Sequence, residues 1–163
     1  MPKDAGPTRR RILDAALRLL RAKGIDAFSI EAVARGAAVA KGLVIYHFGS
    51  RADLLRQCGA TLQAERGERL RRARAGAPGV RGIDAGWEEL RRQTADGTTR
   101  AWLGLLAAGA APPPAAADAD AVAATALLDG CAVALGAGVA EPPVREAHDA
   151  LWLALLRVIE EVG

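Results

Sequence analysis

Apolar residues recur with helical spacing along most of the chain. Between Thr8, a suitable N-cap, and Gly24, a suitable residue just past a helix end, apolar side chains follow one helical face. This pattern predicts a helix over about residues 8–23. Its inward positions are Ile12, Leu13, Ala16, Leu17 and Leu20.

Two shorter helical segments follow the first. Ser29 is a suitable N-cap, and apolar residues over 30–37 lie at positions i, i+3, i+4 and i+7. Residues 38–39 leave room only for a tight connection before a third short helix over about residues 40–46. Val44 and Phe48 are its expected inward residues.

The rest of the chain also has a helical pattern. Ser50-Arg51-Ala52-Asp53 has the form of a capping box, and it starts a long helix that reaches about residue 75. The Gly- and Pro-containing stretch 75–82 predicts a loop. Further helices are expected over about residues 83–95, 98–110, 117–137 and 143–162. The predicted fold is all-α, with an N-terminal three-helix domain and a C-terminal helical bundle.

Composition agrees with this fold class and excludes others. Apolar residues make up 51% of the chain and aromatic residues only 4%, with Ala and Leu dominant, so an all-β fold is nearly excluded. Cys58 and Cys131 are too few for a disulfide scaffold or a zinc site. No signal peptide is visible and no uncharged apolar run reaches the roughly 20 residues of a membrane span. We therefore expect a cytoplasmic protein with no membrane partner.

Charge is distributed unevenly. Residues 1–75 hold 16 Lys and Arg against 7 Asp and Glu, a net charge of +9, whereas residues 76–163 hold 6 against 12, a net charge of −6. A basic half joined to an acidic half indicates a polyanion-binding module fused to a different one. Within the basic half, the arginines from Arg66 to Arg74 are interpreted as a solvated helix end rather than as a DNA contact.

The short helices and tight turn in this basic half are typical of a helix-turn-helix, whose second helix enters the major groove. The outward face of the third helix is expected to present Lys41, Gly42, Leu43 and Tyr46 to the bases. Residues placed to reach phosphates are Thr8, Arg9, Arg10, Ser29, His47 and Arg51. For His47, packing or capping within the domain is an equally weighted alternative.

Residues 8–55 resemble the DNA-binding domain of the TetR family of bacterial transcriptional regulators. The matching residues, spread over this segment at the family's spacing, are Thr8, Ile12, Ala15-Ala16, Gly24, Phe28-Ser29-Ile30, Val33-Ala34, Val39, Lys41-Gly42, Tyr46-His47-Phe48, Arg51 and Leu54-Leu55. The chain departs from the family pattern at four positions. Ala38 replaces the usual Gly of the turn, Ala40 a Ser or Thr cap, Leu43 a small or hydroxyl residue, and Ile45 a common Tyr.

The resemblance implies a homodimeric repressor that binds a double-stranded DNA operator. Residues 6–55 would form the DNA-binding domain, with the helix-turn-helix at about 29–48. Residues 56–163, including the connecting helix to about 75, would bind a small-molecule inducer and dimerise. Inducer binding would shift the long helix, so that the DNA-binding domains of the two subunits no longer fit into successive major grooves.

The second half offers candidates for both roles. Candidate pocket residues are Trp87, Trp102, Leu106, Asp129, His148 and Trp152, with core packing of the tryptophans and a surface position for Asp129 as alternatives. The last helix has an apolar face wider than one stripe, which indicates burial in a bundle core or a dimer interface. Candidate interface residues are Leu127, Gly130, Ala134, Gly138, Leu151, Leu155 and Val158, and Gly130, Ala134 and Gly138 recur every four residues.

Enzyme chemistry has little support in the sequence. A glycine-rich phosphate loop, a nucleophile elbow and metal-ligand spacing are all missing, so we expect no catalytic residues, cofactor or metal. A second hypothesis is a helical dimer that binds a small molecule or protein and has lost specific DNA binding. The missing cap at Ala40 and the apolar Leu43 favour this alternative, and the basic first half argues against it.

Overall fold

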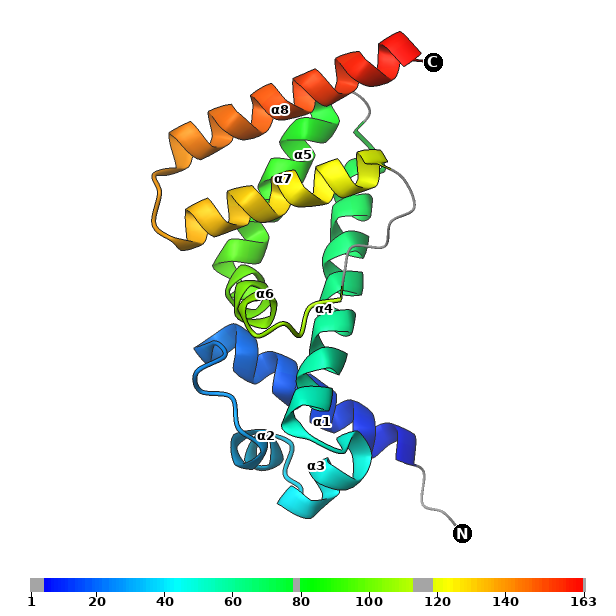
Figure 1. Cartoon of the computed structure of the whole chain (residues 1–163), viewed down its shortest axis with the longest axis vertical. Helices are drawn as coiled ribbons and strands as arrows, with labels where there is room; N and C mark the ends of the chain where they lie inside the picture. Colours follow the sequence, from blue (N-terminus) through cyan, green and yellow to red (C-terminus); the bar gives the residue numbers. More distant parts are fainter. Residues whose placement is uncertain (1–4, 78–79, 113–118, 163) are drawn as a thin grey trace. The chain divides into compact units, whose positions relative to one another are not determined.

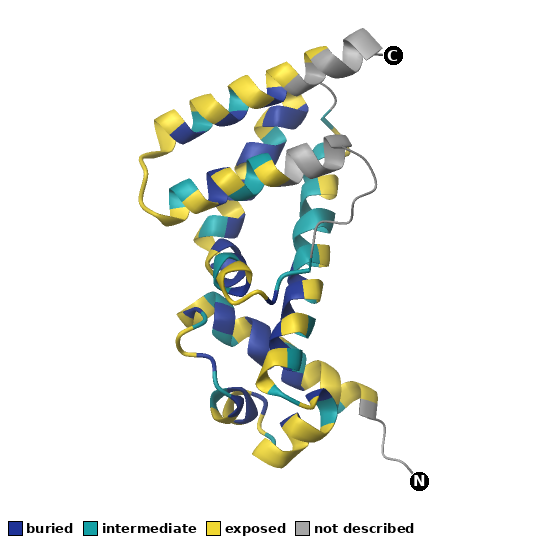
Figure 2. Cartoon of the chain, in the orientation of Figure 1, coloured by how far each residue is buried: buried dark blue, intermediate teal, exposed yellow. Residues whose placement is uncertain are grey.

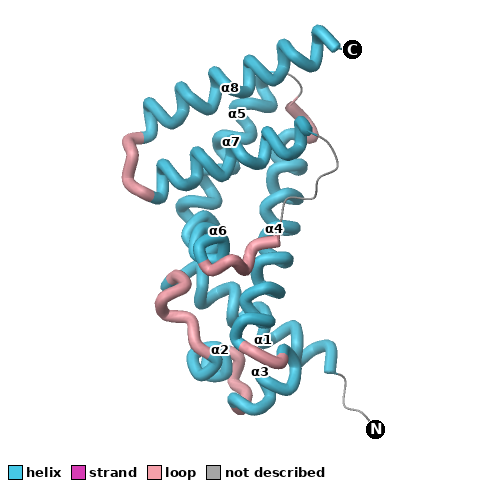
Figure 3. The backbone as a smooth tube through the Cα atoms, viewed as in Figure 1, coloured by secondary structure: helices cyan, strands magenta, loops and turns pink. Residues whose placement is uncertain are grey.

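The computed structural model describes residues 5–77, 80–112 and 119–162; within them, the side chains of residues 5, 80, 119–125, 155–156 and 158–162 are outside the description. Among the described residues, the only regular secondary structure is α-helix, which confirms the predicted all-α class (Figures 1 and 3). The helices are α1 (Ala5–Lys23), α2 (Ile30–Gly36), α3 (Lys41–Phe48), α4 (Arg51–Arg74), α5 (Val80–Ala95), α6 (Thr98–Ala107), α7 (Ala119–Gly136) and α8 (Glu141–Val162).

The chain divides into two compact units. The first comprises residues 1–64 and 97–112, and the second residues 65–96 and 113–163. Helix α4 therefore begins in the first unit and ends in the second, and α6 belongs to the first unit. The division into a DNA-binding and a regulatory domain that the sequence suggests is functional and stays a prediction.

The core of the first unit is built from one face of each of its helices. In α1 this face is the predicted stripe, with Ile12, Ala16 and Leu20 fully buried. Val33 of α2 and Val44 of α3 are also fully buried, and all of these residues belong to one hydrophobic cluster. Figure 2 shows how buried and exposed residues alternate along the helices. Burial of this apolar face, rather than helix propensity alone, holds segments as short as α2 and α3 in place.

Helix α6 packs on the first unit through close backbone approaches. Gly97 has φ +81° and lies so near α1 that a Cβ atom there would be 2.3 Å from the Arg21 carbonyl oxygen. Arg100 donates to the carbonyl oxygen of Ala22 at 3.1 Å. Trp102 is 2% exposed and joins the same core as α1.

The second unit has its own apolar core, with buried polar residues beside it. Trp87 and Leu90 of α5 pack with Cys131 and Ala132 of α7 and with Val144 of α8. Helices α7 and α8 lie side by side in antiparallel directions (Figure 3). Glu89, Gln93 and His148 are buried beside this core. No helix among the described residues has the length and apolarity needed to cross a membrane.

The observed helix ends differ from the predicted ones at several places. Helix α1 begins at Ala5, so Thr8 lies inside its first turns and is not the N-cap. Helix α5 begins at Val80, inside the predicted loop, and α6 ends at Ala107 instead of near residue 110. Helix α8 begins at Glu141, so its two prolines occupy the first turn, where their missing N–H groups cost no intrahelical bond.

Candidate nucleic-acid interface

Helices α2 and α3 form the predicted helix-turn-helix. The Ser29 hydroxyl accepts a hydrogen bond from the Ala32 N–H at 3.1 Å, so Ser29 is the N-cap of α2 as predicted. The turn closes with the Val39 N–H donating to the Ala34 carbonyl at 3.0 Å, and Ala38 has a φ of +52°. Ala40 precedes α3 and supplies no side-chain cap, as its missing hydroxyl predicts.

Helix α3 has one buried and one exposed face. Val44 and Phe48 face inward as predicted, at 0% and 8% exposure. The opposite side, which we call the reading face, consists of Lys41, Gly42, Leu43, Ile45 and Tyr46. Tyr46 is 79% exposed, and Gly42 has no atom within 4 Å of the place a Cβ would take. Three large apolar or aromatic side chains, Leu43, Ile45 and Tyr46, are therefore exposed on one short helix, where a partner can contact them.

Lys41 is not a free cation on this face. Its Nζ forms an ion pair with Glu31 of α2, and both side chains are more than half exposed. The hydrogen bond from Lys41 lowers the pKa of Glu31. Glu31 is acidic and lies near the candidate phosphate contacts, so Lys41 must be shared with or released from Glu31 when a phosphate binds.

Two arginines border the reading face and are held by the fold. The Arg51 Nε donates to the Phe28 carbonyl oxygen at 3.2 Å, and its guanidinium lies 5.5 Å from the centre of the Phe28 ring. Arg9 donates to Gln57 at 2.9 Å and lies 4.9 Å from the Phe48 ring centre. These contacts orient both guanidinium groups while leaving donors for phosphate oxygens.

The remaining predicted contact residues are spread around this helix pair. Arg10 is exposed, and Thr8 is half-buried on α1. His47 is half-buried, and its ring lies edge-on to Tyr46 at a centroid distance of 5.2 Å. The Ser29 hydroxyl oxygen accepts the cap hydrogen bond of α2, and its O–H can still donate to a phosphate oxygen. Ile45, 40% exposed, belongs to the reading face and was missed because the sequence reading treated it only as a departure from a family pattern.

Comparisons with known proteins agree with this geometry. Residues 12–58 match the family model described as bacterial regulatory proteins, tetR family. Residues 12–58 are therefore a DNA-binding domain of the TetR type. The curated transcriptional regulator AcrR of Shigella flexneri is 33% identical over 66 residues, which are 40% of this chain and 31% of AcrR. SrpR of Pseudomonas putida is 37% identical over 60 residues, which are 37% of this chain and 28% of SrpR.

The solved structures extend the similarity beyond the DNA-binding segment. The multidrug binding protein EbrR, complexed with imidazole, is 27% identical with a TM-score of 0.68, and the match covers 95% of this chain and 93% of EbrR. A structure of EbrR with ethidium is 25% identical with a TM-score of 0.54, covering 94% of this chain and 99% of that chain. The similarity to solved structures therefore covers both the helix-turn-helix and the helices that follow it.

The predicted pocket residues of this chain separate into two groups. Trp87, His148 and Trp152 lie together in the second unit, with ring centroids of neighbouring pairs 5.2 Å and 6.4 Å apart. Trp102 is instead part of the first unit's core, and Leu106 is 41% exposed on α6. The sequence grouped them because an alanine-rich chain gives no signal for which side of a helix packs where. Asp129 forms an ion pair with Arg66 at 2.8 Å.

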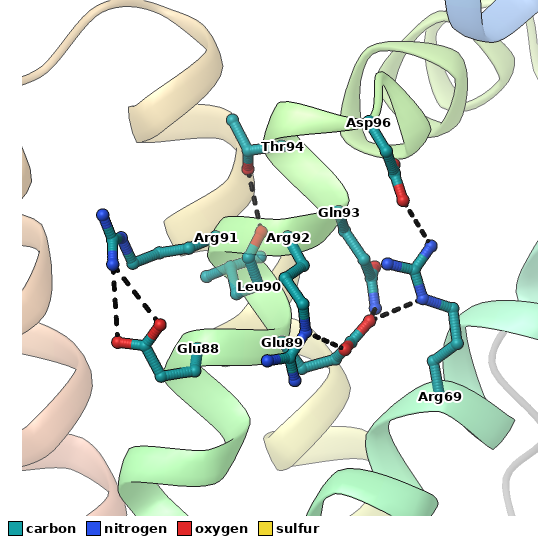
Figure 4. A network of polar contacts seen from close by, with 9 residues as sticks. All are labelled: Arg69, Glu88, Glu89, Leu90, Arg91, Arg92, Gln93, Thr94 and Asp96. Atoms are coloured by element: carbon teal, nitrogen blue, oxygen red, sulfur yellow. Dashed lines mark hydrogen bonds and ion pairs between the residues drawn. The ribbon is translucent and has the colours of Figure 1, made fainter.

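The arginines from Arg66 to Arg74 do not form one solvated helix end. Arg71 and Arg72 are exposed and pair with Glu68 on their own helix, as that interpretation expects. Arg69 instead donates to the buried Glu89 at 2.6 Å and to Asp96 at 2.7 Å (Figure 4). Glu89 lies between Trp87 and Leu90 on the buried side of α5. A buried carboxylate needs a cationic partner, so Glu89 was the residue from which an inward-facing arginine could have been predicted.

The predicted interface residues occupy different environments. Leu127 and Ala134 pack in part against the core of their own unit, and Gly130 and Leu151 are exposed. Gly138 lies beyond the end of α7 with φ +83°, where it closes the helix, so it does not continue a row of small residues. The side chains of Leu155 and Val158 lie outside the described residues. Val133 and Leu153, 51% and 43% exposed, are further apolar residues on these two helices.

Proposed function

We propose that this protein is a sequence-specific DNA-binding transcriptional regulator, acting as a homodimeric repressor that a small-molecule inducer releases from its operator. The observation that carries the proposal is the reading face of α3. It combines exposed apolar and aromatic side chains with a lysine, on a short helix held by a helix-turn-helix of the TetR family. A regulator of transcription acts where the DNA is, which in a bacterium is the cytoplasm.

The chemistry of the reading face supports base contact at the centre and phosphate contact at the edge. Leu43 and Ile45 offer apolar contact for thymine methyl groups, and the Tyr46 hydroxyl can hydrogen-bond a base or a phosphate. Lys41, Arg51 and Arg9 supply positive charge beside them. The exposed backbone of Gly42 permits close approach of a phosphate or sugar.

The regulatory part of the proposal rests on similarity and on chain continuity. EbrR is described as a multidrug binding protein in complex with imidazole, and its match extends over nearly the whole of this chain. Helix α4 runs without interruption from the helix-turn-helix unit into the second unit. Because α4 is continuous, a ligand that favours one arrangement of the second unit can also change the position of α2 and α3.

The curated relatives are matched over about a third of their length, so the experiment must measure the activity directly. Fluorescence anisotropy is used to titrate the protein against a duplex from the DNA flanking its own gene and against a random duplex. We expect Lys41→Ala and Arg51→Ala to weaken binding to both duplexes, with the slope of log affinity against log salt reduced by about one for each lost phosphate contact. Tyr46→Ala should weaken binding and alter the preference between the duplexes.

Glu31→Gln is expected to change DNA affinity in the opposite direction. Removing this carboxylate frees Lys41 and removes a negative charge beside the DNA, so binding to both duplexes should tighten. Arg91→Ala, an exposed substitution on α5 of the second unit, is the control and should change neither affinity nor salt slope. Wild-type affinity in Lys41→Ala, Arg51→Ala and Tyr46→Ala on both duplexes would remove the assignment of this face.

A further inference from the structure

Three aromatic rings form a row inside the second unit. His148 of α8 lies between Trp87 of α5, at a centroid distance of 5.2 Å, and Trp152, one turn further along α8, at 6.4 Å. All three side chains are buried, and the histidine has no exposed surface. We call these three residues the aromatic cluster.

The aromatic cluster contains polar atoms without partners. The Nδ1 atom of His148 lies 2.9 Å from an oxygen of Asp149, which fixes a proton on Nδ1 and makes Nε2 of the neutral ring an acceptor. This Nε2 atom and the Nε1–H of Trp152 are buried, and neither has a hydrogen-bond partner among the described residues. A buried polar atom without a hydrogen bond destabilises the fold, so two such atoms in one cluster indicate a site that something polar fills.

A guanidinium group covers each end of the row, and the two ends differ in charge. Arg145 lies 5.4 Å from the Trp87 ring centre and is paired with both Asp84 and Asp149. Arg74 lies 4.2 Å from the Trp152 ring centre, and no carboxylate among the described residues pairs with it. Burial lowers the pKa of Arg74, which shows that the fold disfavours this uncompensated charge.

We propose that the aromatic cluster and Arg74 form the binding site for a small aromatic carboxylate that carries a hydroxyl group. The carboxylate pairs with Arg74 and accepts from the Trp152 Nε1–H, and the hydroxyl donates to His148 Nε2. The aromatic body of the ligand takes the place on the Trp152 ring that the Arg74 side chain occupies. Arg74 is free to move aside because no hydrogen bond holds its guanidinium within the described residues.

A cationic ligand is disfavoured at this site. The tryptophan faces that would attract a cation already hold the chain's own guanidinium groups, and a second cation beside Arg74 would be repelled. An anion instead compensates Arg74 and satisfies the Trp152 donor. The role of such a ligand as inducer rests on the proposed function, whereas its binding does not.

Isothermal titration calorimetry without DNA tests the site directly. The probes are the three monohydroxybenzoates, each with its uncharged hydroxybenzamide as the matched comparison, together with benzoate and ethidium. We expect at least one hydroxybenzoate to bind about tenfold or more tightly than its amide, because only the acid forms the charge-assisted bonds with Arg74. Benzoate, which lacks the hydroxyl, should bind about fivefold more weakly than that hydroxybenzoate.

Variants locate the binding site on the chain. Arg74→Gln should reduce hydroxybenzoate affinity about tenfold or more, and Trp152→Phe, which keeps a ring but removes the N–H, about fivefold. Arg72→Gln, two residues away, exposed and paired with Glu68, is the control and should leave affinity unchanged. The comparison of acid with amide uses the wild-type chain alone, so it stands even if a variant fails to fold.

Three results would overturn the proposal. These are equal binding of acid and amide, tighter binding of ethidium than of every hydroxybenzoate, and absence of heat with all acids up to about 10 mM, which would mean that water alone fills the site. Release of a bound duplex by the hydroxybenzoate is measured separately. A chain that binds the acid but never binds DNA contradicts the proposed function and leaves this site intact.

Discussion

Ala38 has a backbone conformation that its side chain disfavours. With φ +52° it occupies the left-handed region, where a Cβ atom costs about 1–2 kcal/mol and where the sequence reading already noted that the TetR family usually has Gly. The turn hydrogen bonds of α2 hold it there. The strain lies at the junction that sets the direction of the reading helix.

Ala38→Gly is therefore expected to raise the free energy of unfolding by about 1 kcal/mol, measured by urea denaturation. Ala60→Gly is the matched control. Ala60 is exposed in the interior of α4, where the same substitution should lower stability by about 1 kcal/mol. Destabilisation by Ala38→Gly similar to that of Ala60→Gly would contradict the strain assigned to Ala38.

His148 makes stability depend on pH. Burial lowers its pKa, only partly offset by the hydrogen bond to Asp149, and the charges of Arg145 and Arg74 lower it further. The folded chain therefore resists protonation more than the unfolded chain does. The contribution of neutral His148 to stability is complete above about pH 6.5, the pKa of a histidine in the unfolded chain. It declines as the pH falls below that value, with a slope of at most about 1.4 kcal/mol per pH unit.

We expect the free energy of unfolding to fall between pH 7.5 and about pH 5.5 in the wild type. His148→Gln should flatten this decline. Denaturant titrations at several pH values provide the measurement. An unchanged pH slope in His148→Gln would show that other groups cause it.

At the scale of elements, helix positions followed from sequence more readily than helix partners did. The α1 stripe, the Ser29 cap and the buried pair Val44 and Phe48 each rest on local spacing or local hydrogen bonds. In α8 the buried residues are Val144, His148 and Trp152, and Leu151 is exposed. The sequence did not predict this choice, because a helix that is apolar on most sides does not reveal which side packs. The sequence pattern did not predict the ion pairs between residues far apart in the chain either.

The polar interior of the second unit illustrates such a long-range network. The Glu89 side chain is 6% exposed and accepts hydrogen bonds from Arg69 at 2.6 Å, Arg92 at 2.9 Å and Gln93 at 3.1 Å (Figure 4). Since Arg69 lies on α4, its ion pair with Glu89 connects the C-terminal part of α4 to α5. Without Glu89, Arg69 keeps its ion pair with Asp96, whereas the buried Gln93 amide loses the acceptor to which it donates.

Glu89→Ala should lower the free energy of unfolding by about 2 kcal/mol, because the hydrogen bonds to this buried carboxylate are lost. Its neighbour Glu88 pairs with Arg91 at 3.3 Å while both side chains are about half exposed, so Glu88→Ala should change stability by less than about 0.5 kcal/mol. Thermal and urea denaturation of the two variants side by side give the comparison. Equal effects of the two substitutions would contradict the structural role of the Glu89 network.

For the whole molecule, the chain order alone did not reveal the compact units. Helix α6 follows α5 in sequence and was assigned to the regulatory half, yet Trp102 and Leu105 pack in the core of the first unit. Two close backbone approaches, at Gly97 to Arg21 and at Gly59 to Ala110, explain this packing. Such approaches depend on glycines whose partners lie far away in sequence, so periodicity does not predict them.

The dimer prediction is also a property of the whole molecule. Val133 and Leu151 are each about half exposed on α7 and α8, the helices that TetR-family resemblance assigns to the dimer interface. We expect a dimer in sedimentation velocity and a shift toward monomer in Leu151→Glu, because a charge is costly in an apolar interface. Leu106→Glu, at an exposed leucine of α6, is the control. A dimer unaffected by Leu151→Glu would place the interface elsewhere.

The most direct test of the central claim is the ratio of affinities for a selected duplex and a random duplex. A duplex is enriched from a random pool by rounds of binding to the wild-type chain, and both affinities are then measured by anisotropy at one salt concentration. A sequence-specific regulator should prefer the selected duplex by about 10³-fold or more. A ratio near one after selection would contradict specific readout by α3 and favour a helical module that has lost it.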